Sequence, residues 1–347
     1  MSISKYEDFL SFLEGKKILL TTHDLVDIDG LVSCYALYQF LETYFKNPVL
    51  SIYFSNVSKD TKNFMKRFTH KFPSFNFNYS NNVKFSDFEV CIIVDTSNIN
   101  QIRTKDGNDN PVEIPYFFID HHHYPEDLTE RKDNNLVSII NEQRSSTAEI
   151  ILDLFKLYNQ ELTLHYKILI IAAILTDSGF FKYGSNETIK NVSKLLDDDV
   201  DIQEIQRMLE KDMDISERIA KIKGSQRVRI VRDGDFLIGI SNASSFGAKI
   251  ASTLLIVGFD ISIVYSIQKK EITINARARK SVCESNRLHL GKIMEELSKE
   301  FNGSGGGHDG AASLTVKTKV DILLEKLILK IKQALKSKLL LINEKYK

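Results

Sequence analysis

The sequence predicts an α/β protein built from two domains that a helical linker joins. At 347 residues the chain is longer than one average domain. Residues 1–196 alternate short apolar segments with segments of helical periodicity, which is typical of a doubly wound, mostly parallel sheet covered on both faces. Residues 197–225 are highly charged and predict the linker, and residues 226–347 carry a second, smaller α/β pattern.

The strands and helices of the first domain follow from the spacing of its apolar residues. Near-continuous apolar segments of strand length are expected to form the sheet, and they are Lys17–Thr22, Val49–Phe54, Glu89–Val94, Tyr116–Ile119 and Leu136–Ile140. Apolar residues three and four positions apart predict the helices, which are Gly30–Phe45, Lys59–Phe68, Ser146–Tyr158 and Thr163–Leu175.

The second domain shows the same two kinds of pattern. Asp233-Gly234 is a turn signal between two apolar segments, Arg227–Val231 and Phe236–Ile240, and predicts a β-hairpin. Periodicity then predicts two further strands and three helices, which are Ile261–Ile267, Glu271–Ala276, Phe246–Val257, Leu288–Phe301 and Val320–Leu341.

The charge balance and the cysteines exclude several classes of protein. Lys plus Arg and Asp plus Glu both number 46, so the net charge is zero. A protein that grips long duplex DNA normally carries a basic surplus, so we expect a short or small phosphorylated substrate. The three cysteines form no CxxC pair, which argues against a disulfide framework and a zinc knuckle. Without a signal pattern or an apolar run of ~20 residues, a cytoplasmic protein with no membrane span is expected.

Acidic and histidine side chains follow three of the predicted strands. His23 comes after the first strand, Asp95 after the third, and Asp120-His121 after the fourth. In open α/β sheets ligands bind at this edge, in the crevice where the strand order reverses. We therefore expect these side chains to lie close together although they are far apart in sequence.

Further carboxylates extend this set, and together they predict a site for two divalent cations. By itself a His-Asp pair is usually a surface or capping pair, and Asp177 reads as the end of a helix. In one crevice, however, the carboxylates would repel one another unless cations neutralised them; they are Asp27, Asp29, Asp95 and Asp177. Carboxylate and imidazole ligands suit Mn²⁺ or Mg²⁺. A pair of such ions is typical of phosphoester hydrolysis, because it can clamp the attacking and leaving oxygens.

These motifs, in this order, resemble those of the DHH phosphoesterase superfamily. The triplet that gives the superfamily its name is Asp120-His121-His122 here. The other amino-terminal motifs match His23-x3-Asp27-x-Asp29, Asp95-Thr96-Ser97 and Asp177-Ser178-Gly179, and Gly305-Gly306-Gly307-His308 resembles the signature of the associated carboxyl-terminal domain. By size and architecture the chain is most similar to the nanoRNase, 3′-phosphoadenosine 5′-phosphate phosphatase and cyclic-dinucleotide phosphodiesterase branch.

The resemblance implies a role for each side chain. His23 and Asp27 would bind one cation, Mn²⁺ being expected and Mg²⁺ or Co²⁺ the alternatives. The second cation would be held by Asp29, His121 and Asp177, with Asp95 bridging the two. His122 would contact the scissile phosphate, and Asp120 would orient a histidine. The first loop lacks the common Pro-Asp-Gly-Asp-Ala arrangement, and His123 is an extra histidine for which a surface position is expected.

The second domain is expected to hold the substrate. The segment from Gly305 to Gly310 formally fits the GxGxxG fingerprint, but it follows a predicted helix rather than a strand, so we exclude a Rossmann site. A loop of Gly305, Gly306 and Gly307 with His308 could instead cradle phosphate oxygens on its backbone amides. Arg277 matches the position where the family holds a terminal phosphate, which suits a bidentate guanidinium. Arg144 is a weaker candidate, because its segment also reads as a helix start.

The resemblance implies hydrolysis of short oligonucleotides, linear or cyclic dinucleotides, or 3′-phosphoadenosine 5′-phosphate. The reaction would be an in-line attack by a hydroxide shared by two cations. A RecJ-like single-strand 5′–3′ exonuclease is the first alternative, against which the modest length and neutral charge argue. An inorganic pyrophosphatase and a non-catalytic nucleotide-binding regulator are the others. A homodimer is left open.

Overall fold

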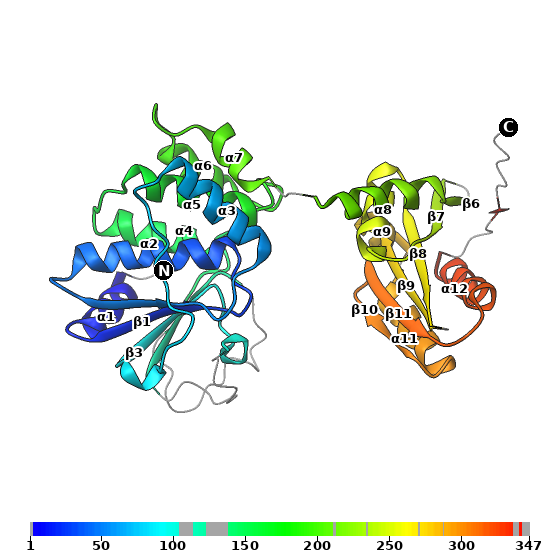
Figure 1. The fold of residues 1–347 in the computed structure, drawn as a ribbon, viewed down its shortest axis with the longest axis horizontal. Helices are drawn as coiled ribbons and strands as arrows, with labels where there is room; N and C mark the ends of the chain where they lie inside the picture. The colour runs from blue at the N-terminus through cyan, green and yellow to red at the C-terminus, as the bar shows by residue number, and fades with distance from the viewer. Residues whose placement is uncertain are drawn as a thin grey trace. The chain divides into compact units, whose positions relative to one another are not determined.

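The computed structural model describes residues 3–103, 114–122, 138–210, 213–233, 235–269, 271–286, 288–335 and 340–341. The chain divides into two compact units, Met1–Lys211 and Asp212–Lys347 (Figure 1). Each unit is described by itself.

A five-stranded parallel sheet forms the centre of the first unit. Its order is β2-β1-β3-β4-β5, and the strands are β1 Lys17–Thr22, β2 Val49–Tyr53, β3 Val90–Val94, β4 Tyr116–Asp120 and β5 Ile139–Ile140. The strand order reverses at β1, because the chain passes outward to β2 and then returns to β3 on the other side of β1. The carboxyl ends of β1, β3 and β4 therefore share one edge, and the predicted parallel α/β sheet is confirmed.

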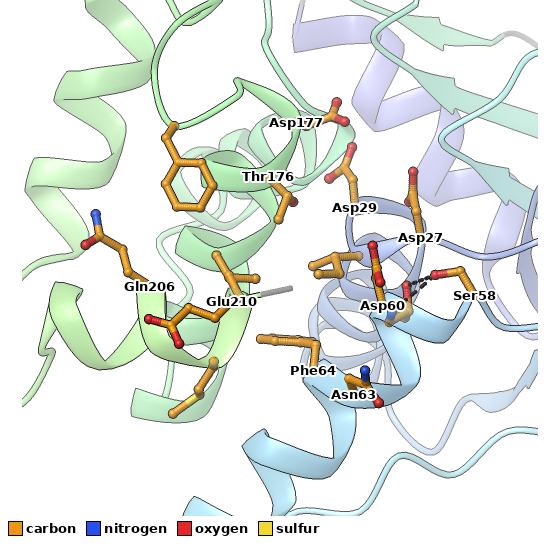
Figure 2. Close-up of a pocket in the computed structure, with 15 residues that line it drawn as sticks. Asp27, Asp29, Ser58, Asp60, Asn63, Phe64, Thr176, Asp177, Gln206 and Glu210 are labelled. Atoms are coloured by element: carbon orange, nitrogen blue, oxygen red, sulfur yellow. Dashed lines mark hydrogen bonds between the residues drawn. The ribbon is translucent and has the colours of Figure 1, made fainter. Parts of the chain in front are cut away.

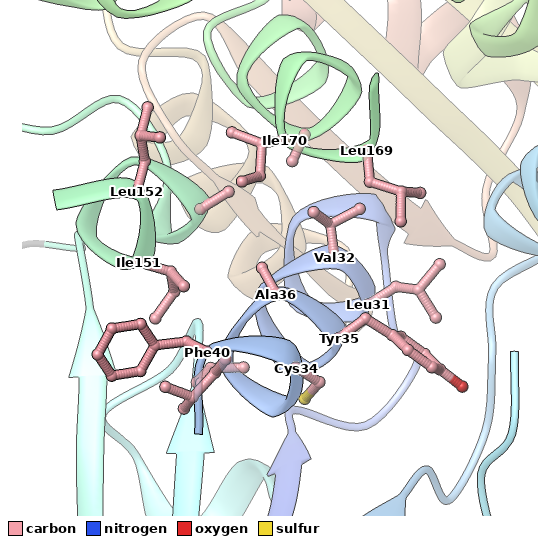
Figure 3. Close-up of a cluster of buried hydrophobic side chains, with 14 of the residues drawn as sticks. Leu31, Val32, Cys34, Tyr35, Ala36, Phe40, Ile151, Leu152, Leu169 and Ile170 are labelled. Atoms are coloured by element: carbon pink, nitrogen blue, oxygen red, sulfur yellow. The ribbon is translucent and has the colours of Figure 1, made fainter. Parts of the chain in front are cut away.

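The helices of the first unit pack over one face of this sheet. They are α1 Ile3–Leu13, α2 Ile28–Tyr44, α3 Lys59–Lys71, α4 Thr147–Leu157, α5 Leu164–Asp177, α6 Asn186–Leu195 and α7 Ile202–Leu209. Figure 3 shows the centre of this layer, where Val32 and Phe40 of α2 meet Ile151 of α4 and Ile170 of α5. All four side chains are buried, and each contributes roughly 1.5–3 kcal/mol by leaving water.

The opposite face of the sheet is covered differently. Its apolar side chains, among them Cys91 and Phe118, pack against Phe85 of η1 Phe85–Asp87 and Ile99 of η2 Ile99–Gln101. Among the described residues, short 3₁₀ turns and loops supply this cover, where the doubly wound pattern suggested helices. A single 3₁₀ turn is too short to leave a periodic signal in the sequence.

The second unit contains a seven-stranded mixed sheet of order β10-β11-β9-β8-β7-β6-β12. Its strands are β6 Arg229–Asp233, β7 Phe236–Asn242, β8 Ile261–Gln268, β9 Glu271–Ala278, β10 Ser304–Gly307, β11 Ala311–Val316 and β12 Leu340–Leu341. The pair β7–β8 is parallel and the other pairs are antiparallel, so the predicted β6–β7 hairpin is confirmed. The helices are α8 Ile215–Gln226, α9 Gly247–Val257, α10 Lys280–Asn286, α11 Leu290–Glu300 and α12 Val320–Leu335.

Two local predictions for the second unit are wrong. Gly305–Gly307 lies in the edge strand β10, paired with β11, and is not a loop. A side chain at Gly305 would place its Cβ 2.7 Å from the carbonyl oxygen of Met294 in α11, so helix packing excludes larger residues there. The sequence pattern does not predict this strand, because glycine has a low strand propensity. The last helix ends at Leu335 instead of Leu341, and β12 follows it.

The boundary between the units falls inside the charged segment 197–225. Helix α7 packs against α3 and α5 in the first unit, and it buries Ile205, Met208 and Leu209 in the main core. Helix α8 packs on α9 in the second unit. Among the described residues, no helix is both long and apolar enough to cross a membrane.

Candidate metal centre

Six histidine and aspartate side chains gather at the carboxyl edge of the parallel sheet. His23 follows β1, Asp95 follows β3 and His121 follows β4. The other three come from helix ends, since Asp27 caps α2, Asp29 lies in its first turn and Asp177 ends α5. The fold brings these residues together because both the strand ends and the helix ends meet at this edge.

The first group of potential ligands consists of His23, Asp27 and Asp95. The His23 Nε2 atom lies 3.7 Å from Asp27 Oδ1 and 3.6 Å from Asp95 Oδ2. The other ring nitrogen, Nδ1, is 2.8 Å from the carbonyl oxygen of Asp24 and is placed to donate to it. With Nδ1 engaged in this way, Nε2 is the ring nitrogen that faces the two carboxylates, which is the arrangement of a metal-binding histidine.

The second group consists of Asp29, His121 and Asp177. The His121 Nε2 atom lies 2.8 Å from Asp177 Oδ2 and 4.0 Å from Asp29 Oδ2. This nitrogen is buried, and it makes no contact with hydrogen-bond geometry among the described residues. A buried imidazole nitrogen that faces carboxylate oxygens in this way suits a shared cation. The ligand atoms within each group all lie within 4.8 Å of one another.

Asp95 stands between the two groups. Its Oδ2 faces His23, and its Oδ1 lies 3.6 Å from His121 Nε2. The residue is 3% exposed, and its backbone adopts a left-handed conformation with φ 59°. Such a conformation is unfavourable for a residue other than glycine and persists mainly where the surroundings enforce it, often at functional sites. The carboxylate of Asp95 is thus placed to bridge two ions.

The amino terminus of α4 holds the carboxylate of Asp29. The backbone N–H groups of Thr147 and Ala148 donate to it over 2.6 and 3.0 Å. The Thr147 hydroxyl also donates to Asp95 Oδ1 over 3.1 Å. Helix amino termini favour anions, so α4 fixes the position of both carboxylates. The sequence predicts the start of this helix but not the carboxylates that Thr147 contacts.

The DHH triplet is ordered by the carboxylate of Asp120. Its Oδ1 accepts from the backbone N–H groups of His121 and His122, over 2.8 and 3.2 Å. The same oxygen lies 2.8 Å from His122 Nδ1. Asp120 is fully buried, whereas the His122 side chain is 50% exposed. The structure therefore makes His122 the histidine that Asp120 orients. His123 lies outside the described residues.

The concentrated negative charge shifts the pKa values of this cluster. Burial lowers the pKa of His23, but Asp27 and Asp95 outweigh it and raise that pKa to about 11. Burial also lowers the pKa of His121, but Asp177 and Asp29 outweigh it and raise that pKa to about 9. Burial and the neighbouring Asp177 raise the pKa of Asp29 to about 7. Burial and Asp29 also hold the pKa of Asp95 well above its usual range.

Cation binding is therefore expected to release protons. At neutral pH and without ions, His23 and His121 hold protons that a cation must displace. Each proton displaced strengthens apparent binding by about tenfold per pH unit as pH rises. Isothermal titration of Mn²⁺ between about pH 6 and about pH 8, in buffers of different ionisation enthalpy, measures both effects. Affinity that is independent of pH, with no proton release, would contradict this description of the site.

The predicted substrate residues occupy other surroundings. Arg144 donates from Nε to Asp153 Oδ2 over 2.9 Å, so a role in phosphate binding stays a prediction. In the second unit, Arg277 pairs with Ala311 across β9 and β11, and the His308 N–H donates to the Ala311 carbonyl over 2.9 Å. Arg277 and the segment after β10 therefore lie at the same end of the strands in that sheet. Arg279 instead donates from Nε to the Phe259 carbonyl oxygen over 3.1 Å.

The donor set fits two divalent cations. It offers imidazole nitrogens and carboxylate oxygens in two groups that share one carboxylate, which is the ligand chemistry of Mn²⁺ and Mg²⁺. No cysteine takes part, since the three cysteines are buried elsewhere. With cations bound, such an arrangement can neutralise a phosphate and activate a water molecule.

Sequence comparison identifies two family models along the chain. Residues 17–176 match the DHH family, N-terminal domain, and residues 247–337 match the DHHA1 domain. An uncharacterized protein of Methanocaldococcus jannaschii is 30% identical over 314 residues, which cover 88% of this chain and 89% of that protein.

A solved structure shows the same fold. An exopolyphosphatase-related protein from Bacteroides fragilis matches 96% of both chains with a TM-score of 0.65 at 17% identity. A manganese-bound exonuclease RecJ matches 95% of this chain and 93% of that chain, with a TM-score of 0.43 and 12% identity. The second match is too distant to support an argument.

Proposed function

The chain belongs to the DHH family of phosphoesterases, and on this premise we propose that it hydrolyses short nucleotide substrates with two divalent cations. The position of Asp95 carries the proposal. One of its oxygens lies 3.6 Å from His23 and the other 3.6 Å from His121. A carboxylate held between two ligand groups in this way is suited to keep two ions at a fixed separation.

The residues around the ions would position and stabilise the reacting phosphate. Bound divalent cations supply Lewis-acid activation of water and neutralise charge on the phosphate. His122 lies beside the ligand His121, and Asp120 engages its Nδ1, so the ring offers Nε2 to a phosphate oxygen. In this role His122 stabilises the negative charge that grows during attack, while Asp120 keeps the imidazole in place.

The second unit would supply the contacts that select a short substrate. Arg277 would bind a terminal phosphate through its guanidinium. The edge strand with Gly305, Gly306 and Gly307, followed by His308, would bind phosphate oxygens with N–H groups that point away from β11. Arg144 of the first unit is a weaker candidate, because Asp153 already occupies its Nε.

The substrates we propose are short oligonucleotides, linear or cyclic dinucleotides, and 3′-phosphoadenosine 5′-phosphate, with Mn²⁺ as the preferred ion. A RecJ-like exonuclease, an inorganic pyrophosphatase and a regulator without activity are the alternatives. The zero net charge argues against an enzyme that tracks along long strands. A metal-binding residue stands at each of the six ligand positions, which argues against a regulator that has lost catalysis.

An activity panel tests the proposal. The purified chain in Mn²⁺ is given defined dinucleotides, a cyclic dinucleotide, 3′-phosphoadenosine 5′-phosphate, a long single strand and pyrophosphate. We expect the short nucleotides to be hydrolysed at least about tenfold faster than the long strand, because the contacts that we propose reach only a few nucleotides. Faster degradation of the long strand would favour the exonuclease, and nucleotide binding without turnover in Mn²⁺, Mg²⁺ or Co²⁺ would favour the regulator.

A further inference from the structure

A cavity of about 680 Å³ opens directly beside the candidate metal centre, within the first unit. Its walls come from α3, α7 and the carboxyl end of α5. Figure 2 shows three of the potential ligands, Asp27, Asp29 and Asp177, together at one end of it. The volume lies within the range of pockets that hold small organic ligands.

The side chains that line this cavity are mainly apolar, amide or acidic. Phe64, Met208 and Leu209 contribute apolar surface, and Asn63 and Gln206 contribute amides. Asp60 and Glu210 contribute further carboxylates (Figure 2). No Lys, Arg or His is among the described residues that line the cavity. These walls disfavour a second phosphate and favour a flat, neutral group whose N–H donors meet carboxylate and amide oxygens.

An exposed aromatic ring lines this cavity. Phe180 lines the cavity, and 49% of the residue is exposed. Its φ of 55° and that of Phe181, 68°, both lie in the left-handed region, which is unfavourable for bulky residues. The turn is held in this strained form by a bond of 2.7 Å from the Phe180 N–H to the Leu175 carbonyl. Strain that exposes a phenyl ring three residues after a potential metal ligand points to a stacking surface.

The cavity wall is fixed by contacts between α3 and α7. Arg67 of α3 donates from Nη1 to the carbonyl oxygens of Met208, over 3.2 Å, and of Glu210. Lys71 Nζ lies 2.8 Å from Glu204 Oε1. These contacts hold α7 at a constant position across from Phe64, so the cavity is a built feature of the unit.

We propose that this cavity is a nucleobase subsite, in which the base of the nucleotide at the metal centre stacks on Phe180. The assignment rests on the proposed function, because a phosphate at the ions sets where the base begins. The N–H groups of a purine would donate to the Asp60, Glu210 or Asn63 side-chain oxygens, and guanine offers the most donors because it carries a ring N1–H beside its amino group. Aromatic stacking tolerates any base, whereas the acidic wall favours bases that present donors.

A single introduced tryptophan tests the assignment without requiring turnover. The chain contains no Trp, so Phe180→Trp provides the only indole. We titrate this variant in Mg²⁺ with guanosine monophosphate and with ribose 5-phosphate, which has the same phosphate but no base. The expected result is saturable quenching by the nucleotide, at least about tenfold tighter than binding of the sugar phosphate. Equal binding of the two, or no change in fluorescence, would overturn the assignment.

Tyr183→Trp is the matched control, since Tyr183 is 72% exposed and does not line the cavity. Its fluorescence should not respond to the nucleotide. If Phe180→Trp does not fold, Phe180→Ala and Tyr183→Ala are compared by calorimetry with the same two ligands. Only the first should lose the preference for the nucleotide, and an unchanged preference overturns the assignment.

Turnover separates this inference from the proposed function. Phe180→Ala should raise KM for a dinucleotide about tenfold and leave kcat nearly unchanged, because stacking binds substrate and transition state alike. If the wild type cleaves dinucleotides and Phe180→Ala cleaves them with an unchanged KM, only the subsite would be contradicted. If the nucleotide quenches the fluorescence of Phe180→Trp but the wild type hydrolyses no substrate of the panel, only the proposed function would be contradicted.

Discussion

Asp95→Asn is expected to lower kcat/KM for a dinucleotide in Mn²⁺ by about 10³-fold or more. The substitution removes the carboxylate that faces both His23 and His121, so neither ion would keep its position. Asparagine tolerates the left-handed backbone at this position, and it removes a buried carboxyl whose pKa is raised. Without ions, the variant should therefore be at least as stable as the wild type.

Kinetics, manganese calorimetry and urea unfolding of one preparation measure all three consequences. Asp87→Asn is the matched control, because Asp87 is exposed and lies before the opposite end of β3. Its activity should equal that of the wild type. Retained turnover in Asp95→Asn would show that the two ligand groups do not act through this carboxylate.

Glu149→Ala is expected to lower the free energy of unfolding by about 3 kcal/mol. Glu149 is fully buried in α4, and its Oε2 accepts from the Ser145 N–H over 2.8 Å and the Ser145 hydroxyl over 2.7 Å. It also accepts from Thr188 over 3.2 Å and from the Asn191 amide over 2.8 Å, both in α6. Alanine would leave all of these donors without this acceptor, and those of Thr188 and Asn191 are buried. Manganese affinity should fall as well, because the start of the same helix holds Asp29.

Urea titration followed by circular dichroism measures the loss, and Glu161→Ala is its control. Glu161 is exposed on the loop before α5, so its removal should change stability by less than about 0.5 kcal/mol. A loss below about 1 kcal/mol in Glu149→Ala would mean that water replaces the carboxylate at little cost.

Much of the fold can be predicted from local patterns. Buried parallel strands are near-continuous apolar segments, so β1, β3 and β4 stand out. The polar residues at their carboxyl ends mark one edge of the sheet. Local patterns do not show that helix α7 belongs to the core, because the segment around it is strongly charged. Its buried face, Ile205 with Met208 and Leu209, becomes visible as core only once α3 and α5 are in place.

By itself, the sequence determined the strand ends, the identity of the potential ligands and their convergence. Apolar periodicity is a local property of the chain, and parallel strands place their carboxyl ends at one edge of a sheet. Tertiary structure alone decided that the first amides of α4 hold Asp29 and that α11 packs on a strand of glycines. It also decided that α3 and α7 enclose a cavity beside the metal centre. Each of these depends on contacts between segments distant in sequence, whose partners are chosen by the packing of the whole unit rather than by their own residues.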